Sequence, residues 1–107
     1  MKAEVPIGIF SIAAMANIAR MTFVGFDGNV CAAGAKSAGV ANADAGTGNM
    51  FPVSPLRVRL VIAGGAVAVG AAVDSDASGY AVTHNSGVIN GYALDAAGAL
   101  GDVIRIV

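Results

Sequence analysis

The sequence predicts an all-β fold, a small barrel or sandwich of about seven to nine short strands. Its second half, from Gly65 to Val107, alternates runs rich in Val and Ile with clusters of Gly, Asp, Asn and Ser. β-branched residues favour strands, and the residues between the runs favour turns. The length of 107 residues suits one core without a linker, so we expect a single domain over 1–107.

Turn residues mark where the predicted strands of this second half begin and end. Val67, Val69 and Val73 alternate with Ala and Gly, which predicts one strand that ends before Asp74. The other predicted elements are a turn at 74–79, a return strand at 80–84, an apolar run at 88–94, a loop at 95–101 and a terminal strand at 103–107.

A further strand is predicted just before this region. Leu56, Val58 and Leu60 alternate with Arg57 and Arg59, which predicts an apolar face toward the core and both arginines on a solvated face. Proline cannot donate a hydrogen bond to a sheet, so the two prolines before this strand place their segment at a sheet edge or in an ordered connection.

The first half of the chain can be aligned with the second. Placing Ala14 on Ala63 also brings Ile18 onto Val67. The alignment predicts two β-lobes related by a pseudo-twofold axis. Chains rich in Ala and Gly also align with themselves by chance, so an unrepeated fold stays the alternative. The predicted lobes are 14–53 and 63–107.

Residues 1–13 are predicted to form an extended N-terminal arm, because Pro6 and Gly8 interrupt its apolar run. The run is too short to span a bilayer, and its removal as a signal peptide is not expected. We expect the arm to contact a neighbouring subunit; the alternative is that it forms the first strand of its own domain. The candidate contact residues are apolar residues of the arm and of a second segment: Val5, Ile7, Ile9, Phe10, Met50 and Phe51.

Composition limits the partners of the chain. Six basic and seven acidic residues give a net charge of −1, and there is no basic run, so nucleic-acid binding is not expected. Apolar residues make up 56% of the chain, yet Ala and Gly contribute many of the small side chains. A core of Ala and Val buries little area per residue, so a lone subunit should be marginally stable and association should stabilise it.

No catalytic, metal or cofactor site is predicted. Cys31 is the sole cysteine, in an apolar setting, and is expected to be a buried small residue. The turn that begins at Asp74 resembles the start of an EF-hand calcium loop, but position twelve holds Asn85 instead of Glu, and strands rather than helices flank it. His84 is expected at the surface end of a strand, without a nucleophile beside it.

The second half also carries a resemblance to a known family. A VxVGAAV strand, an Asp-Ala-Ser-Gly hairpin, a GxALDAAG loop and a closing GDVIRIV strand lie in this order over Ala63 to Val107. This arrangement resembles the small capsid cement, or head decoration, proteins of tailed bacteriophages.

The resemblance implies a virion protein that is made in the host cytoplasm and acts by contact alone on the outer surface of the capsid. It would bind the major capsid protein, bridge capsomers and stabilise the lattice, and the arm could then contact the capsid. The resemblance also implies a homo-oligomer, with a homotrimer favoured over a dimer, since such proteins commonly sit at local threefold positions.

Two other classes of function stay open. One is a subunit of another β-rich assembly, such as an adhesin or an accessory protein. The other is a biotinyl or lipoyl carrier domain, which presents a lysine at a hairpin tip, usually beside Met; Lys36 lies in GAKSAG without that Met. An enzyme is not expected.

Overall fold

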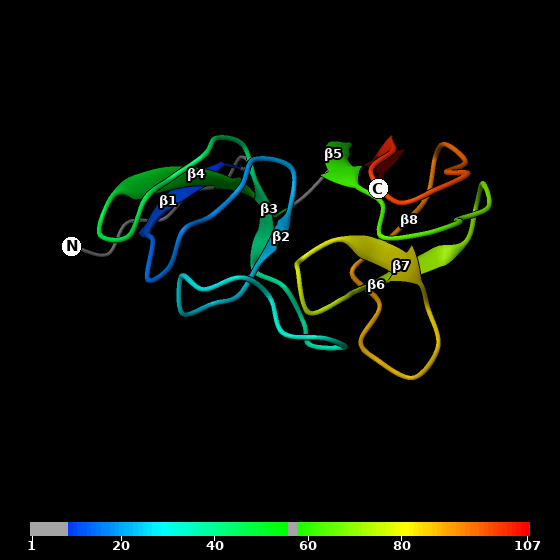
Figure 1. Cartoon of the computed structure of the whole chain (residues 1–107), viewed down its shortest axis with the longest axis horizontal. Coiled ribbons are helices and arrows are strands. Elements are labelled where there is room, and N and C mark those ends of the chain that lie inside the picture. The colour runs from blue at the N-terminus through cyan, green and yellow to red at the C-terminus, as the bar shows by residue number, and fades with distance from the viewer. Residues whose placement is uncertain (1–8, 56–57) are drawn as a thin grey trace.

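The computed structural model describes residues 9–55 and 58–107, which form short β-strands and no helix (Figure 1). The strands are β1 Phe10–Ala13, β2 Phe23–Val24, β3 Gly39–Ala41, β4 Met50–Ser54, β5 Arg59–Ile62, β6 Ala72–Ser75, β7 Ala81–Thr83, β8 Gly91–Tyr92 and β9 Val103–Ile106. They pair antiparallel in the sheet orders β1-β4-β3-β2, β5-β9 and β7-β6-β8, without closing into a barrel. The predicted all-β fold is confirmed in its open, sandwich-like form. The described part of the chain has no helix long and apolar enough to cross a membrane.

Each half of the chain pairs its first strand with its last. In the first half, β1 lies beside β4 with Phe10 opposite Val53. In the second half, β5 lies beside β9 with Arg59 opposite Ile106. The two registers coincide when β1 is placed on β5 and β4 on β9, so each paired residue of the first two strands has a counterpart in the other two.

The turn after the first strand of each half also has the same backbone. Met21 has a φ of 64°, in the left-handed region, and its counterpart Gly70 has a φ of 82°. The amide of Met21 donates to the carbonyl of Ala41 at 2.8 Å, as that of Gly70 does to Ala93 at 2.7 Å. We propose that this agreement reflects a duplication of one lobe.

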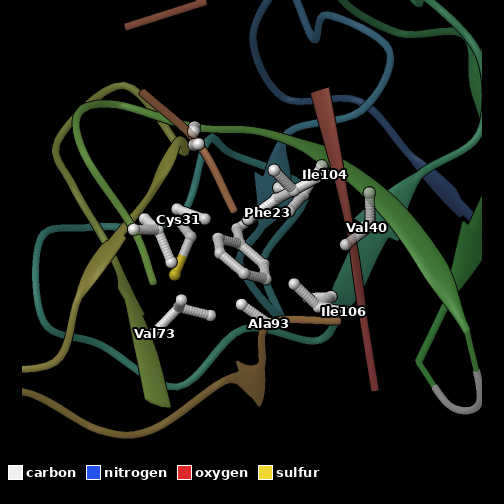
Figure 2. Close-up of a cluster of buried hydrophobic side chains, with 12 residues drawn as sticks. Phe23, Cys31, Val40, Val73, Ala93, Ile104 and Ile106 are labelled. Carbon is white, nitrogen blue, oxygen red and sulfur yellow. The ribbon is translucent and has the colours of Figure 1, made fainter. Parts of the chain in front are cut away.

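The two halves share one hydrophobic cluster. The core of the first half includes Phe51 and Val53. The larger cluster lies in the second half but takes in Phe23, Cys31 and Val40 from the first. Figure 2 shows Phe23 and Val40 beside Ile104 and Ile106 of β9. Strands β2 and β3 therefore belong to the first sheet and cover the core of the second half.

A buried asparagine holds the same junction together. Asn90 is 3% exposed and lies just before β8. Its Oδ1 accepts the Ser37 amide and its Nδ2 donates to the Ala35 carbonyl, each at 2.9 Å. Its backbone amide donates to Val73 at 2.8 Å. Because the side chain bonds to the first half while the backbone amide bonds within the second, Asn90 links the two halves.

Two predicted boundaries of the second half are wrong. The run from Val67 to Val73 is not one strand, because the turn at Val69 and Gly70 interrupts it and leaves Val69 66% exposed. Asp74 belongs to β6 and not to the following turn, and it is only 5% exposed. Hydrogen-bond partners within the fold allow this carboxylate to be buried in a strand.

The predicted arm needs a similar correction at its end. Its last four residues, Phe10–Ala13, form β1, the edge strand of the first sheet. For this part of 1–13 the alternative interpretation, a first strand of the same domain, is the one found. Residues 1–8 lie outside the described residues.

Candidate contact surfaces

The six predicted contact residues fall in different environments. Ile9 is 56% exposed and Met50 63% exposed, and Phe10 is partly buried against the core of the first half. Phe51 is only 2% exposed, so its prediction as a surface contact is wrong. It follows Met50 in β4, and successive strand residues face opposite sides. The other two, Val5 and Ile7, lie outside the described residues.

Arg59 is also placed opposite to the prediction. It is 8% exposed and points inward from β5, whereas a solvated face was predicted for it. Its guanidinium donates to the carbonyls of Pro55 at 3.3 Å and Asn90 at 3.2 Å. Its Nε has no acceptor among the described residues, and burial lowers the pKa of the guanidinium. The side chain replaces an apolar core residue at that position, since its counterpart in β1 is Phe10.

Because Arg59 faces inward, an apolar surface faces outward. Leu60, Val103 and Val107 are 44%, 47% and 51% exposed on the outer face of the β5-β9 sheet. We call these three residues the outer patch. Their counterparts in the first half are Ser11, Met50 and Ser54. The first half has the same strand pairing with Ser11 and Ser54 at two of these positions. The strand pairing therefore does not require the outer patch to be apolar.

An ion pair lies beside the outer patch. Arg105 of β9 binds Asp95 through Nη2 at 2.8 Å and Nε at 2.9 Å, and its amide donates to the same carboxylate at 3.0 Å. These hydrogen bonds lower the pKa of Asp95 to about 2, and the carboxylate raises the pKa of Arg105. Arg105 and Asp95 thus neutralise each other beside the outer patch.

Asp74 and His84 form a second pair, at the end of β6. His84 Nδ1 lies 2.7 Å from Asp74 Oδ1, and the other carboxylate oxygen accepts the amides of Asn85 at 3.3 Å and Gly87 at 3.1 Å. Burial alone would raise the pKa of Asp74, but the hydrogen bonds from His84, Asn85 and Gly87 bring it below its usual value. The carboxylate therefore fixes the loop that follows β7.

The turn after β6 uses its second aspartate in the same structural manner. Asp76 Oδ1 accepts the amides of Ser78 and Tyr80, both at 2.9 Å, and Gly79 has a φ of 79°. Strands β6 and β7 flank the turn, unlike the helices of an EF-hand. Within residues 9–55 and 58–107, no three His, Cys, Asp or Glu side chains gather in a way that would hold a metal ion.

Cys31 lies in the shared cluster, as predicted. It is 1% exposed and forms no disulfide, and burial raises the pKa of its thiol. A thiol that is both covered and protonated is a poor nucleophile, so it contributes packing.

Comparison with known proteins identifies the kind of protein to which this surface belongs. The chain matches the model of the phage cement proteins over residues 7–107. The chain belongs to the phage cement protein family. No curated protein matches it.

A solved structure supports the same assignment for this cement protein. It is similar to the N base of head fiber gp8.5 in bacteriophage phi29, with a TM-score of 0.77 and 26% identity over 92% of this chain and 91% of that chain. The sequence-based resemblance is confirmed, and it extends well into the first half. The protein is therefore a structural protein of the phage virion, associated with the capsid.

The outer patch was missed in the sequence of this cement protein for a definable reason. Alternation along β5 separates two faces but does not say which face is inside. A usable signal lay in the two halves: the positions of Ser11 and Ser54 correspond to those of Leu60 and Val107. A solvated position in one lobe that turns apolar in the other indicates a contact surface.

Proposed function

We propose that this cement protein binds the outer surface of a phage capsid and stabilises the lattice by bridging neighbouring capsomers. The family match over residues 7–107 carries the proposal, and the similarity to a phage head fiber base supports a position on the head. The partner is the major capsid protein, and the action is contact alone, without catalysis or a cofactor.

Bridging needs a unit with several contact points. We propose a homo-oligomer, with a trimer favoured over a dimer. The small core supports it, since many buried apolar residues are Ala and Val and bury little area each. Several weak contacts on one rigid unit combine through effective concentration, so the oligomer holds the shell more tightly than a single subunit. A species of 10.4 kDa in light scattering at micromolar concentration would contradict it.

We assign the capsid contact to the outer patch. Its three residues are apolar, and the nearby Arg105–Asp95 pair adds no net charge. Burying such a surface removes apolar area from water.

The test uses phage heads that lack the protein. Purified protein is added, bound copies are counted after sedimentation, and the temperature at which heads release DNA is recorded. We expect binding and a higher release temperature. Leu60→Asp should lose binding, whereas Val88→Asp should keep it, because Val88 is equally exposed (45% against 44%) but lies in the loop between β7 and β8.

Three results would each contradict one part of this proposal. Failure of the wild-type protein to bind heads would overturn the proposed function. Equal binding by both variants would overturn the outer patch as its site. Binding without any change in release temperature would overturn the stabilising role.

A further inference from the structure

We propose that copies of this protein associate head to tail by repeating, between molecules, the packing that joins the two halves within one molecule. The inference rests on the proposed self-association and names the two surfaces that form it. Both surfaces are found by taking the counterparts of the residues at the internal junction.

The internal junction has a side-chain part and a backbone part. Phe23 and Val40 of the first half are 0% and 1% exposed, because they cover the inner face of the β5-β9 sheet (Figure 2). That face includes Val61, which is 0% exposed. At the edge of the same sheet, the Ile62 amide donates to the Met21 carbonyl at 2.8 Å.

The contact between the two halves is not reciprocal. A pseudo-twofold axis would also join Ala13 to Gly70, the counterparts of Ile62 and Met21. No such hydrogen bond exists among the described residues, and both Ala13 and Gly70 are exposed. The second half thus has an unused copy of the covering surface, and the first half has an unused copy of the covered surface.

The unused covering surface, which we call the tail, is apolar. Tyr92 is 51% exposed where its counterpart Val40 is 1% exposed. Val69 is 66% exposed and corresponds to Arg20, and Leu94 is 38% exposed and corresponds to the polar Asn42. At two positions the internal junction has polar residues and the tail has apolar ones. The two halves are already joined by the chain, whereas separate copies need apolar surface in order to associate.

The unused covered surface, which we call the head, lies on β1. Phe10 and Ile12 are partly exposed, although they pack on the core of the first half. Their counterparts, Arg59 and Val61, are buried. Ile9 adds an exposed apolar side chain next to them. β1 is also the edge strand of its sheet, so its outward backbone groups can accept another chain.

Head and tail lie at opposite ends of the molecule. In Figure 1, β1 lies at one end of the long axis, and the light green segment that joins β5 to β6 and contains the turn at residues 69–70 lies at the other end. The longest dimension is 40 Å. Unlike surfaces at two ends make a heterologous contact, which closes into a ring when the rotation between copies permits. A closed ring is the form we propose, since it leaves neither surface uncovered.

A cross-linking experiment tests the head-to-tail contact. Leu60 and Arg20 line one hollow of about 320 Å³ at the internal junction, so their counterparts Ser11 and Val69 should meet between copies. The double variant Ser11→Cys, Val69→Cys is treated with a short bismaleimide. We expect a covalent series whose largest member has the mass of the oligomer in light scattering.

Each single variant and the wild-type protein serve as controls and should stay monomeric on a denaturing gel, because Cys31 is buried and each single variant adds only one side of the contact. Cross-linking of either single variant would show a twofold contact and overturn the proposal. An uncross-linked double variant that is oligomeric in solution would overturn these surfaces but leave the self-association intact. A monomeric wild-type protein would overturn the self-association itself.

A matched pair of substitutions gives an independent measurement. Val69→Asp should raise the dissociation constant of the oligomer by at least about tenfold, since association would desolvate an unpaired carboxylate. Leu100→Asp should leave it unchanged, because Leu100 is equally exposed (67% against 66%) but lies in the loop before β9. Equal effects would overturn the tail assignment. No capsid is needed, so the outcome does not depend on whether the protein binds heads.

Discussion

Arg59, Asp74 and Asn90 are buried polar residues that the fold satisfies to different degrees. Asn90 uses both ends of its side-chain amide, and Asp74 accepts three hydrogen bonds. Arg59 donates only to carbonyls and leaves Nε without an acceptor in the described structure. A buried guanidinium without a carboxylate adds little stability. Its counterpart Phe10 shows that the same position accepts an apolar side chain.

Acid should weaken the fold through Asp95. Its pKa is about 2 in the folded protein, below the usual value of 3.8. A lowered folded-state pKa stabilises the fold above the unfolded pKa, and this contribution is lost as the pH falls from about 4 toward 2. We expect Asp95→Asn to lower the urea midpoint at pH 7 and to flatten its fall on acidification. Superimposable pH profiles of the variant and the wild-type protein would contradict this role of the Arg105 pair.

At the scale of elements, two loops cross at a pair of glycines. A Cβ on Gly87 would lie 2.5 Å from the Gly34 Cα, which is too close for any side chain. The Gly34 amide donates to Ser75 at 2.9 Å and its carbonyl accepts the Val88 amide at 2.9 Å. The crossing therefore ties a loop of the first half between two elements of the second.

Gly87→Ala should lower the free energy of unfolding by about 1–3 kcal/mol, because the backbone of Gly34 must move. Gly65→Ala is the control: no atom lies within 4 Å of its added Cβ and its φ is not positive, so we expect no loss and a gain of up to about 1 kcal/mol. Urea unfolding measures both. Equal stabilities of the two variants would refute the crossing as a constraint.

The turn at residues 76–79 should be independent of calcium. Asp76 already accepts two backbone amides, and Asp74 is occupied by His84 and the following loop. We expect equal melting temperatures with calcium and with a chelator. A rise of several degrees in calcium would reverse this assignment, since a ligand that binds only the folded state stabilises it.

The sequence was most informative where turns are local. The strands at 81–83 and 103–106 lie within the predicted segments, because Gly and Asx residues mark the ends of both. The inward face of β5 and the turn at Val69 were not predictable from alternation, since both depend on partners distant in the sequence: Arg59 donates to Asn90, and the Gly70 amide donates to Ala93. Exposure depends on the folded chain: of the described candidates, Ile9 and Phe10 belong to the proposed head, Met50 is exposed on β4, and Phe51 is buried.

At the scale of the whole molecule, the two halves share a strand register but differ in their surfaces. Ser11 and Ser54 of the first half correspond to Leu60 and Val107 on the outer face of the second. The same strand pairing accepts polar and apolar side chains at these positions. The outer patch and the head and tail surfaces can therefore change without altering the core.

Deleting residues 1–8 separates the fold from assembly. β1 begins at Phe10 and pairs with β4 inside the described residues, so we expect the truncated protein to stay soluble and melt cooperatively. If Val5 and Ile7 contact a neighbouring subunit or the capsid, head binding or assembly should be lost. Aggregation of the truncated protein would end the arm hypothesis, and full retention of assembly would make the arm dispensable.

The sharing of Phe23 and Val40 between the halves has a consequence for synthesis. The N-terminal half leaves the ribosome first, yet the β9 residues Ile104 and Ile106 that pack on these two side chains are synthesised more than 60 residues later. Pairing of distant strands is also slow compared with local contacts. A nascent chain of this protein therefore carries an uncovered apolar face until β9 has been synthesised, and a transcript that stops before Val103 should yield a product that aggregates.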